Sequence, residues 1–351
     1  MSKQITVGIS VGDLNGIGLE IVLKCLSNKD LIKEITPVIY ASKAACNFYK
    51  QLFNLEDFEF ISIDDHSKIK KNKVNIINVW TEDVKIEPGT PTRVSGEKAF
   101  ESLKAAVNGL ASNHVDVLVT APIDKKNIQS KDFNFPGHTE YLAKMANVEE
   151  ALMFLVSDKL RVGVVTGHIP LQDVSKNISK DAILNKVIQM DKSLRNDFGI
   201  GRPKIAVLGL NPHAGDNGVI GKEDQEIIRP AIEAANAKGI TTIGPYPADG
   251  LFGSSGYAKF DGILAMYHDQ GLIPFKAISF GSGVNFTAGL PIVRTSPDHG
   301  TAFDIAGKNL ANPDSFRQAI YTAVDIFNTR KEERSLQSDP LETSKGRKDR
   351  Y

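Results

Sequence analysis

The sequence is poor in the features that mark several classes of protein. It has only two cysteines in 351 residues, Cys25 and Cys46, and their spacing is not that of a metal site. No run approaches the roughly 18–20 apolar residues that cross a membrane. The opening MSKQITVGISVGD has no basic region followed by a long apolar core. We therefore expect reduced structural thiols, no signal peptide and a cytoplasmic protein.

An excess of one charge is also absent. Lys and Arg total 42 and Asp and Glu total 42, so the formal net charge is zero. This balance argues against a dedicated nucleic-acid or membrane-surface binder. It leaves room for a local basic pocket that takes an anionic small molecule.

Two common nucleotide-binding motifs are missing. The glycine-rich turn GDLNGIG at 12–18 lies between an expected strand and an expected helix, where backbone N–H groups can hold a phosphate. It is not GxGxxG, and it lacks the Lys-Ser/Thr pair of a Walker loop. We expect a tight structural turn at this place.

Strand and helix signals alternate along the chain. Apolar runs such as QITVGISV and VDVLVT predict buried strands, and an apolar stripe marks a helix over Glu97–Leu110. The alternation predicts an α/β fold with a largely parallel sheet, and the length suffices for two domains. The last helix is expected over about Asp314–Phe327. Charged residues and Ser dominate after it, so residues 329–351 are expected to be a disordered tail.

Three apolar strands each carry a histidine at or just after their C-terminal end. They are VGVVTGH, IAVLGLNPH and GILAMYHDQG, and Gly271 is expected to break the chain in the last. Open α/β sheets bind ligands at that edge, and three imidazoles with an open position make a catalytic metal site. Any one of His168, His213 and His268 could instead be a core histidine whose ring hydrogen-bonds to the backbone. Together they predict a site for a divalent metal.

Two cations are the best candidates for holding an anionic substrate. Lys276 and Arg294 flank Asn285 in an otherwise small and apolar stretch. Arg binds phosphate or carboxylate bidentately and Lys acts as a point charge, although either could lie on a solvated face. His138 stands near a helix start, where backbone N–H groups favour an anion.

Two aspartates could act on the chemistry or simply cap helices. Asp249 follows a strand and could be a general base or a hydrogen-bond anchor. Asp269 could orient the ring of its neighbour His268. Both could equally be helix N-caps. The stretch from His299 to Ala302 has no mechanism that its spacing reveals.

Seven motifs occur in an order that resembles one known family. They are GDLNGIGLE, FPGHTEYLA, TGHIPLQDV, NPHAGD, PYPADGLF, MYHDQGLIPFK and GVNFTAGLPIVRTSPDHGTAFDIAGK. Together they resemble the 4-hydroxythreonine-4-phosphate dehydrogenases of pyridoxal 5′-phosphate biosynthesis, from about Ile5 to Phe327.

The resemblance implies an isocitrate/isopropylmalate dehydrogenase-like fold with three layers and two α/β domains. The first domain would comprise residues 1–125 with about 285–328, and the second about 126–284. The active site would lie in the cleft between them, in a homodimer whose partner contributes to each site. NAD would bind without a Rossmann fingerprint, which agrees with the missing motif.

The resemblance also implies roles for particular residues. The metal ligands would be His168, His213 and His268, one of them supplied by the neighbouring subunit, with zinc, magnesium, cobalt and manganese all open. The residues that contact the substrate would be His138, Thr139, Lys276, Asn285 and Arg294. Catalysis would involve Asp249 and His138. On a weaker analogy, NAD would be bound by His299, Thr301 and Asn312.

The implied activity is NAD-dependent oxidation and decarboxylation of 4-phosphohydroxy-L-threonine to 3-amino-2-oxopropyl phosphate. The sequence departs from the family pattern at Leu14-Asn15, Asp124 and Gly250. A related acid, phosphoerythronate or phosphothreonate, therefore remains an alternative substrate. A metal-dependent hydrolase is the rival from another class, because three His and an Asp base need no nucleotide. A non-catalytic ligand-binding protein is a third reading, in which replacing His213 leaves ligand affinity intact.

Overall fold

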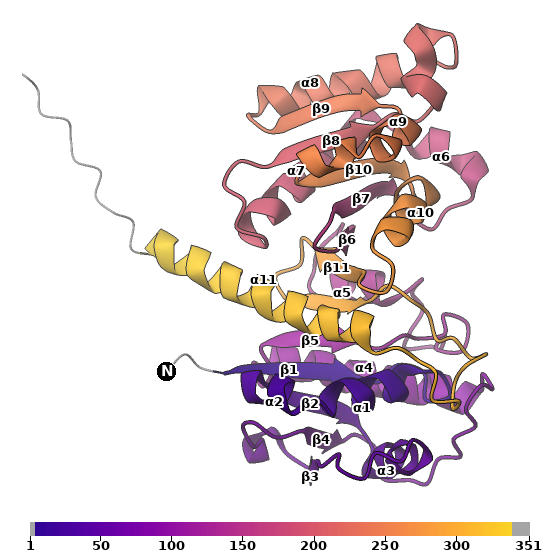
Figure 1. Ribbon diagram of the computed structural model, residues 1–351, viewed down its shortest axis with the longest axis vertical. Coiled ribbons are helices and arrows are strands. Elements are labelled where there is room, and N and C mark those ends of the chain that lie inside the picture. The colour runs from indigo at the N-terminus through magenta and orange to yellow at the C-terminus, as the bar shows by residue number, and fades with distance from the viewer. Residues whose placement is uncertain (1–3, 339–351) are drawn as a thin grey trace, which may run out of the picture.

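A single 12-stranded sheet runs through residues 4–338, which are the residues that the computed structural model describes (Figure 1). The strand order is β3-β4-β2-β1-β5-β12-β11-β6-β7-β10-β8-β9. Neighbouring strands are parallel except at the centre, where β11 is antiparallel to β12 and β6, and β6 to β7. The predicted α/β fold with a largely parallel sheet is therefore confirmed.

The element bounds follow the predicted alternation. The strands are β1 (Ile5–Ser10), β2 (Ile35–Ala41), β3 (Ile61–Ile63), β4 (Asn75–Asn78), β5 (Val117–Thr120), β6 (Leu152–Val156), β7 (Arg161–Thr166), β8 (Lys204–Leu208), β9 (Thr241–Tyr246), β10 (Gly262–Tyr267), β11 (Val284–Ala288) and β12 (Arg294–Pro297). The α-helices are α1 (Gly18–Leu26), α2 (Lys29–Glu34), α3 (Lys43–Leu52), α4 (Arg93–Ala111), α5 (His138–Met145), α6 (Leu171–Asn177), α7 (Lys180–Asn196), α8 (Arg229–Ala237), α9 (Ala248–Gly253), α10 (His268–Ile278) and α11 (Asp314–Ser338). Short helical turns are η1 (His66–Lys68), η2 (Pro212–Gly218), η3 (Asp224–Ile228) and η4 (Gly256–Lys259).

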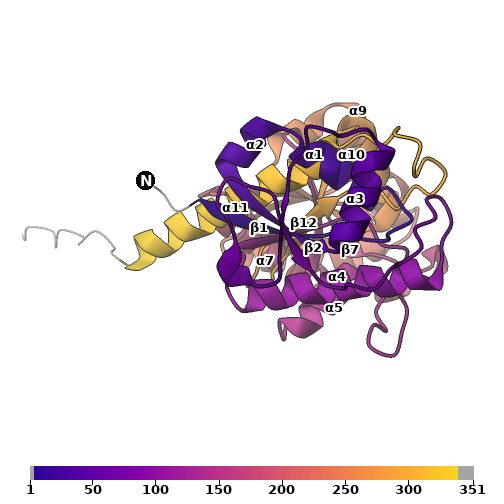
Figure 2. The ribbon, with the colours of Figure 1, turned by 90° about the horizontal axis from the view of Figure 1, so that it is seen from below.

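Helices cover both faces of the sheet, which explains the continuous apolar runs in the strands. In β10, Leu264 and Met266 belong to a core that includes α1, α7, α8 and α11, whereas Ile263 and Ala265 pack with α9 and α10 on the opposite face. The half with β1 has the same layering. Figure 2 shows α1 and α2 on one side of its strands and α4 on the other.

The second face is covered in two separate parts. A cluster with α4 and α5 packs on the half that contains β1–β5, and a cluster with α9 and α10 packs on the half that contains β7–β10. The central strands β6, β11 and β12 lie between these two helical layers. The predicted division into two domains stays a prediction, because the sheet is continuous across both halves.

Helix α11 corrects the expectation of a disordered tail for residues 329–338. It continues from Asp314 to Ser338, ten residues or so beyond the predicted end. Arg330 anchors this extension by an ion pair with Asp197 at 2.6 Å and by donating to the carbonyls of Leu290 and Ile292. Once a helix has formed and packed against the protein, each further residue adds a backbone hydrogen bond at little cost in free energy, so charged residues can extend it. Residues 339–351 lie outside the described part of the chain.

Gly271 does not break the chain as expected but lies inside α10. A Cβ atom at this position would come within 2.8 Å of Val162 Cγ1 and 3.0 Å of Ala265 Cβ. The glycine therefore lets α10 pack closely on β7 and β10. Within residues 4–338, no helix is long and apolar enough to cross a membrane.

Candidate functional site

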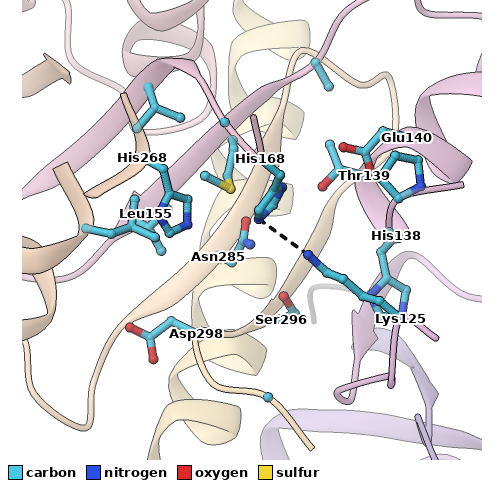
Figure 3. Close-up of a pocket in the computed structure, with 18 of the residues that line it drawn as sticks. Lys125, His138, Thr139, Glu140, Leu155, His168, His268, Asn285, Ser296 and Asp298 are labelled. Atoms are coloured by element: carbon cyan, nitrogen blue, oxygen red, sulfur yellow. Dashed lines mark hydrogen bonds between the residues drawn. The ribbon is translucent and has the colours of Figure 1, made fainter. Parts of the chain in front are cut away.

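A cleft of about 540 Å³ opens where the two helical layers leave the central strands uncovered (Figure 3). Its floor includes Leu155 of β6, Asn285 of β11 and Ser296 of β12, and its walls come from α5, α10 and the loop after β5. The cleft brings together eight of the predicted site residues. They are His138, Thr139, His168, His268, Lys276, Asn285, Arg294 and His299.

Two of the predicted metal ligands face each other in the cleft. His168 follows β7 and His268 follows β10, which are adjacent parallel strands, and the ring centroids are 5.3 Å apart. Asp269 Oδ1 lies 2.7 Å from His268 Nδ1, so it orients the ring and leaves Nε2 for another partner. Burial, then the Lys125 ammonium and His268, lower the pKa of His168. Two imidazoles in this arrangement fit a divalent metal as two of its ligands.

The third predicted ligand lies elsewhere. His213 follows β8, on the far side of β10 from β7, and it is exposed in η2. From His213 to Asn217 the backbone has positive φ throughout, so η2 is a left-handed turn. No group of three or more His, Cys, Asp or Glu side chains within residues 4–338 could hold a metal ion. One chain therefore supplies two of the three ligands, and the three-histidine site stays a prediction that needs a second copy.

Arg294 is the most unusual residue of the cleft, because it is a buried cation with neutral partners. Its side chain donates to Thr120 Oγ1 at 2.6 and 3.1 Å and to Thr287 Oγ1 at 3.1 Å, and the residue is 2% exposed. Burial lowers the pKa of Arg294 to about 9, against the opposite effect of Glu140, so the guanidinium stays charged at neutral pH. A buried charge of this kind calls for an anion.

Two lysines add to the positive charge of the cleft. Lys276 Nζ donates to the backbone carbonyl of Asp298 at 3.1 Å, and Lys125 Nζ lies 3.5 Å from His168 Nε2. Among the described residues, neither lysine forms an ion pair, and the same is true of Arg294. Glu140 and Asp298 are carboxylates on the same lining. The three cations nevertheless leave the cleft suited to a substrate with more than one negative group.

Within residues 4–338, three buried polar atoms of the cleft lining lack a hydrogen-bond partner. They are Nε2 of His138, the first residue of α5, Oδ1 of Asn285 and Nε2 of His299. Burial, then Arg294 and Lys125, hold the pKa of His138 well below its usual value, so this imidazole is neutral. Unsatisfied buried groups are rare in proteins, and here they lie on the lining of one cleft. They fit polar groups of a ligand.

The glycine-rich turn at 12–18 uses its N–H groups within the protein. Asp13 N donates to the carbonyl of Pro122, Gly16 N to that of Asp13 and Ile17 N to that of Thr301. These contacts support the expectation of a structural turn. They also tie it to the stretch around Thr301.

The predicted NAD residues are dispersed. His299 lines the cleft and its Nε2 is buried without a partner, whereas Thr301 and Asn312 are not part of the lining. Asn312 Oδ1 accepts from Asp314 N at the start of α11, so this side chain has a structural use. Asp249 lies exposed in the first turn of α9, outside the cleft of its own chain. The roles of these residues stay predictions.

Sequence reasoning missed Lys125, which lines the cleft beside His138 and His168 (Figure 3). A usable signal was present, since Lys125 follows the buried strand β5 just as the histidines follow theirs. It also missed Thr120, which holds Arg294 and is hidden inside an apolar run.

The comparisons with known proteins agree with the resemblance seen in the motifs. A family profile described as "Pyridoxal phosphate biosynthetic protein PdxA" matches residues 33–323. The chain is 47% identical over 340 residues to a 4-hydroxythreonine-4-phosphate dehydrogenase of Bacteroides thetaiotaomicron, covering 97% of this chain and 93% of the other. It is 42% identical to one of Sulfurihydrogenibium sp., covering 93% of this chain and 100% of the other.

Solved structures match in the same way. The 4-hydroxythreonine-4-phosphate dehydrogenase of Klebsiella pneumoniae superposes with a TM-score of 0.79 at 35% identity, covering 93% of this chain and 98% of that one. Isocitrate dehydrogenase of Methylococcus capsulatus matches with a TM-score of 0.50 at 12% identity, covering 95% and 89%. The second likeness concerns the fold alone, and it confirms the expected isocitrate dehydrogenase-like architecture.

Proposed function

Because the chain belongs to the PdxA family of pyridoxal phosphate biosynthetic proteins, we propose that it is an NAD-dependent dehydrogenase of 4-phosphohydroxy-L-threonine. The substrate is oxidised at C3 and loses its carboxylate, and the product is 3-amino-2-oxopropyl phosphate. The observation that carries the proposal is the buried, unpaired Arg294 guanidinium in a cleft that also holds a histidine pair.

The cleft offers a partner for each polar group of this substrate. Arg294 and Lys276 hold the phosphate and the carboxylate, which are the two anions that the unpaired cations call for. Asn285 Oδ1 and the neutral His138 Nε2 are the free buried atoms that can hydrogen-bond to the ammonium and hydroxyl groups. Thr139 lies beside His138 in the same wall (Figure 3).

The metal would be held by His168 and His268 together with His213 of a second copy of the chain. A divalent ion at this place would lower the pKa of the substrate hydroxyl and polarise the carbonyl formed from it. Asp269 keeps the His268 ring in the orientation in which Nε2 is available. The metal's identity, whether zinc, magnesium, cobalt or manganese, is left open.

Exposed apolar side chains near these histidines support a homodimer. Leu171 is 72% exposed just after His168, Ile273 is 66% exposed on α10, and Val219 is 81% exposed just after η2. Burial of large exposed apolar side chains by a second copy of the chain would favour association. A second copy seated on these residues would bring its His213 to the cleft.

The general base would come from the same copy as His213. We assign this role to Asp249, which takes the proton of the C3 hydroxyl. It follows β9, the neighbour of β8, and Leu208 pairs with Tyr246 at the ends of these strands. Since both residues follow the same edge of the sheet, a copy that delivers His213 to a site delivers Asp249 with it.

NAD, when bound, would supply the acceptor for the hydride of C3, and His299, Thr301 and Asn312 are the residues that we propose would hold it. The new ketone lies β to the carboxylate, so it accepts the electron pair when CO₂ leaves. A proton then returns to C2. The cytoplasmic location predicted from the sequence belongs to this proposal, and two free, buried cysteines support it.

The test is NADH formation by the purified full-length protein after chelation, with each metal and each substrate added separately. We expect turnover of 4-phosphohydroxy-L-threonine that needs both NAD and a divalent metal. Turnover of phosphoerythronate or phosphothreonate alone would show that the enzyme carries out the same chemistry on a different substrate. Product formation without NAD would favour the hydrolase.

A further inference from the structure

We infer that Lys125 is a further substrate-binding residue, whose ammonium group holds an oxyanion of the substrate beside the histidine pair. Figure 3 shows its side chain reaching into the cleft between His138 and His168. The inference rests on the proposed function for the identity of the substrate, and on the geometry of the cleft for the binding itself.

The backbone around Lys125 is fixed by contacts that aim the side chain. The Lys125 carbonyl accepts from Gln129 Nε2 at 3.0 Å, and the same amide donates to the carbonyl of Phe135 at 2.9 Å. Gln129 therefore ties the loop after β5 to the segment that leads into α5. These are the two walls between which the lysine projects.

Among residues 4–338, the ammonium group has no strong partner of its own. Its one polar contact with them is His168 Nε2 at 3.5 Å, the outer limit of a hydrogen bond. No carboxylate of residues 4–338 forms an ion pair with it, although Glu140 lies on the same wall. The position of a Cβ atom on Gly137 would be 3.9 Å from Lys125 Cε and 3.5 Å from Glu140 Oε2, so both side chains border this glycine at the start of α5.

The charges around Lys125 indicate what it binds. Arg294 and Lys125 act on His138 from within the same cleft, and a third cation, Lys276, is part of the lining. Mutual repulsion of such cations is relieved by an anion placed among them. The carboxylate and the phosphate of the substrate are the two candidate oxyanions, and the carboxyl carbon lies two bonds, and the phosphorus three bonds, from the reacting carbon C3.

The neighbouring Lys126 provides a matched control. It is exposed and does not line the cleft, and its backbone N–H is held by Asp124 Oδ1 at 3.0 Å. The two lysines thus share a loop, a charge and a side-chain length. They differ in access to the cleft.

The test compares Lys125→Met, Lys125→Arg and Lys126→Met in the full-length enzyme. With 4-phosphohydroxy-L-threonine we expect Lys125→Met to raise KM about ten- to a hundredfold, because a charge-assisted hydrogen bond is lost. Lys125→Arg should recover part of the loss, and Lys126→Met should behave as wild type.

Binding of inorganic phosphate and of unphosphorylated 4-hydroxy-L-threonine is measured by calorimetry without NAD. Weakening of phosphate binding identifies the phosphate as the oxyanion, and weakening of the unphosphorylated ligand identifies the carboxylate.

Calorimetry separates the failure of this inference from the failure of the proposed function. If wild type binds either probe but turns over no substrate, the proposed function fails and the effect of Lys125→Met on binding still decides the role of the lysine. The inference is overturned if Lys125→Met binds both probes, and retains KM, within about twofold of wild type and of Lys126→Met.

Discussion

Arg294 shows how a residue can serve binding at a cost to stability. Its guanidinium is buried against two threonine hydroxyls, so the folded protein carries the desolvation of a charge that no carboxylate offsets. In the proposed function, a phosphate or carboxylate of the substrate would supply the missing partner. The favourable free energy of that contact would then contribute to substrate binding.

Arg294→Met should separate the two effects. We expect substrate binding to weaken by about 1.5–3 kcal/mol, because a charge-assisted contact is lost. The free energy of unfolding without substrate should be unchanged or about 1–2 kcal/mol higher, because an unpaired buried charge is removed. Calorimetric titration and urea unfolding measure the two quantities. A variant that binds substrate normally, or that loses several kcal/mol of stability, would contradict the assignment.

His138 predicts a pH dependence of stability. Its pKa in the folded protein is held well below 6.5, so its contribution is complete above about pH 6.5 and declines as the pH falls, while the unfolded chain takes up the proton. The loss from one such group is at most about 1.4 kcal/mol per pH unit. His138→Gln should lose less stability than wild type between about pH 8 and pH 5 in urea unfolding. Equal slopes in the two proteins would show that His138 is not a buried neutral group.

Single residues of the site were predictable where one rule applied to them. His168 and His268 were found because the C-terminal ends of neighbouring strands meet at one edge of the sheet. The same rule placed His213 in the set, but adjacency along the sheet does not bring it into the same cleft. The burial of Arg294 could not be read from the sequence, since it depends on Thr120 and Thr287 from other strands.

At the scale of elements, α11 fastens the two halves of the molecule on the side opposite the cleft. Phe316 and Ile320 belong to the large core, and Arg330 reaches Asp197, just after α7, and the carbonyls between β11 and β12. In Figure 1 this helix crosses the molecule between its two halves. Part of the segment that the composition predicted to be a disordered tail therefore belongs to a helix that contacts both halves of the molecule.

Arg330→Ala should destabilise the protein strongly. Both charged side chains are largely buried, 13% and 4% exposed, and removing the arginine leaves Asp197 without its counter-ion. The expected loss is about 3–5 kcal/mol in the free energy of unfolding. Arg334→Ala is the control, because Arg334 lies exposed on the same helix. Equal stability of the two variants would show that the ion pair contributes little.

Most helices and strands could be predicted from the spacing of apolar residues, but the residues at which they end could be predicted less well. Apolar alternation and runs predicted most of the strands but not β11 or β12, and the fold class followed from their order. Gly271 was misread, since a glycine in a helix gives the same local signal as a chain break. The extension of α11 depends on an ion pair with a residue more than a hundred positions away, which no local pattern contains.

At the scale of the whole molecule, one chain forms the cleft that we propose for the substrate but brings together only two of the three proposed metal ligands. His168 and His268 lie in the cleft, whereas His213 and Asp249 follow the strands at the outer end of the sheet. If two copies exchange these groups, a dimer has two composite sites. Each site then needs its cleft from one copy and its remaining ligand from the other.

Mixing two inactive variants tests this exchange. His168→Ala and His213→Ala should each abolish activity alone, because each removes a ligand from both sites of its homodimer. After co-refolding in equal amounts, half the dimers are mixed and one of their two sites is intact, so about a quarter of the wild-type activity should return. Recovery should fail for His168→Ala mixed with His268→Ala, since both defects lie in the same half of the site. No recovery in the first mixture would place all three ligands in one chain.

The measurement that tests the account most directly is the stoichiometry of a complete reaction of limiting 4-phosphohydroxy-L-threonine with excess NAD and a divalent metal. Oxidation coupled to decarboxylation predicts one NADH, one CO₂ and one 3-amino-2-oxopropyl phosphate for each substrate consumed. NADH without CO₂ would contradict the loss of the carboxylate, and substrate consumption without NADH would contradict the dehydrogenase itself.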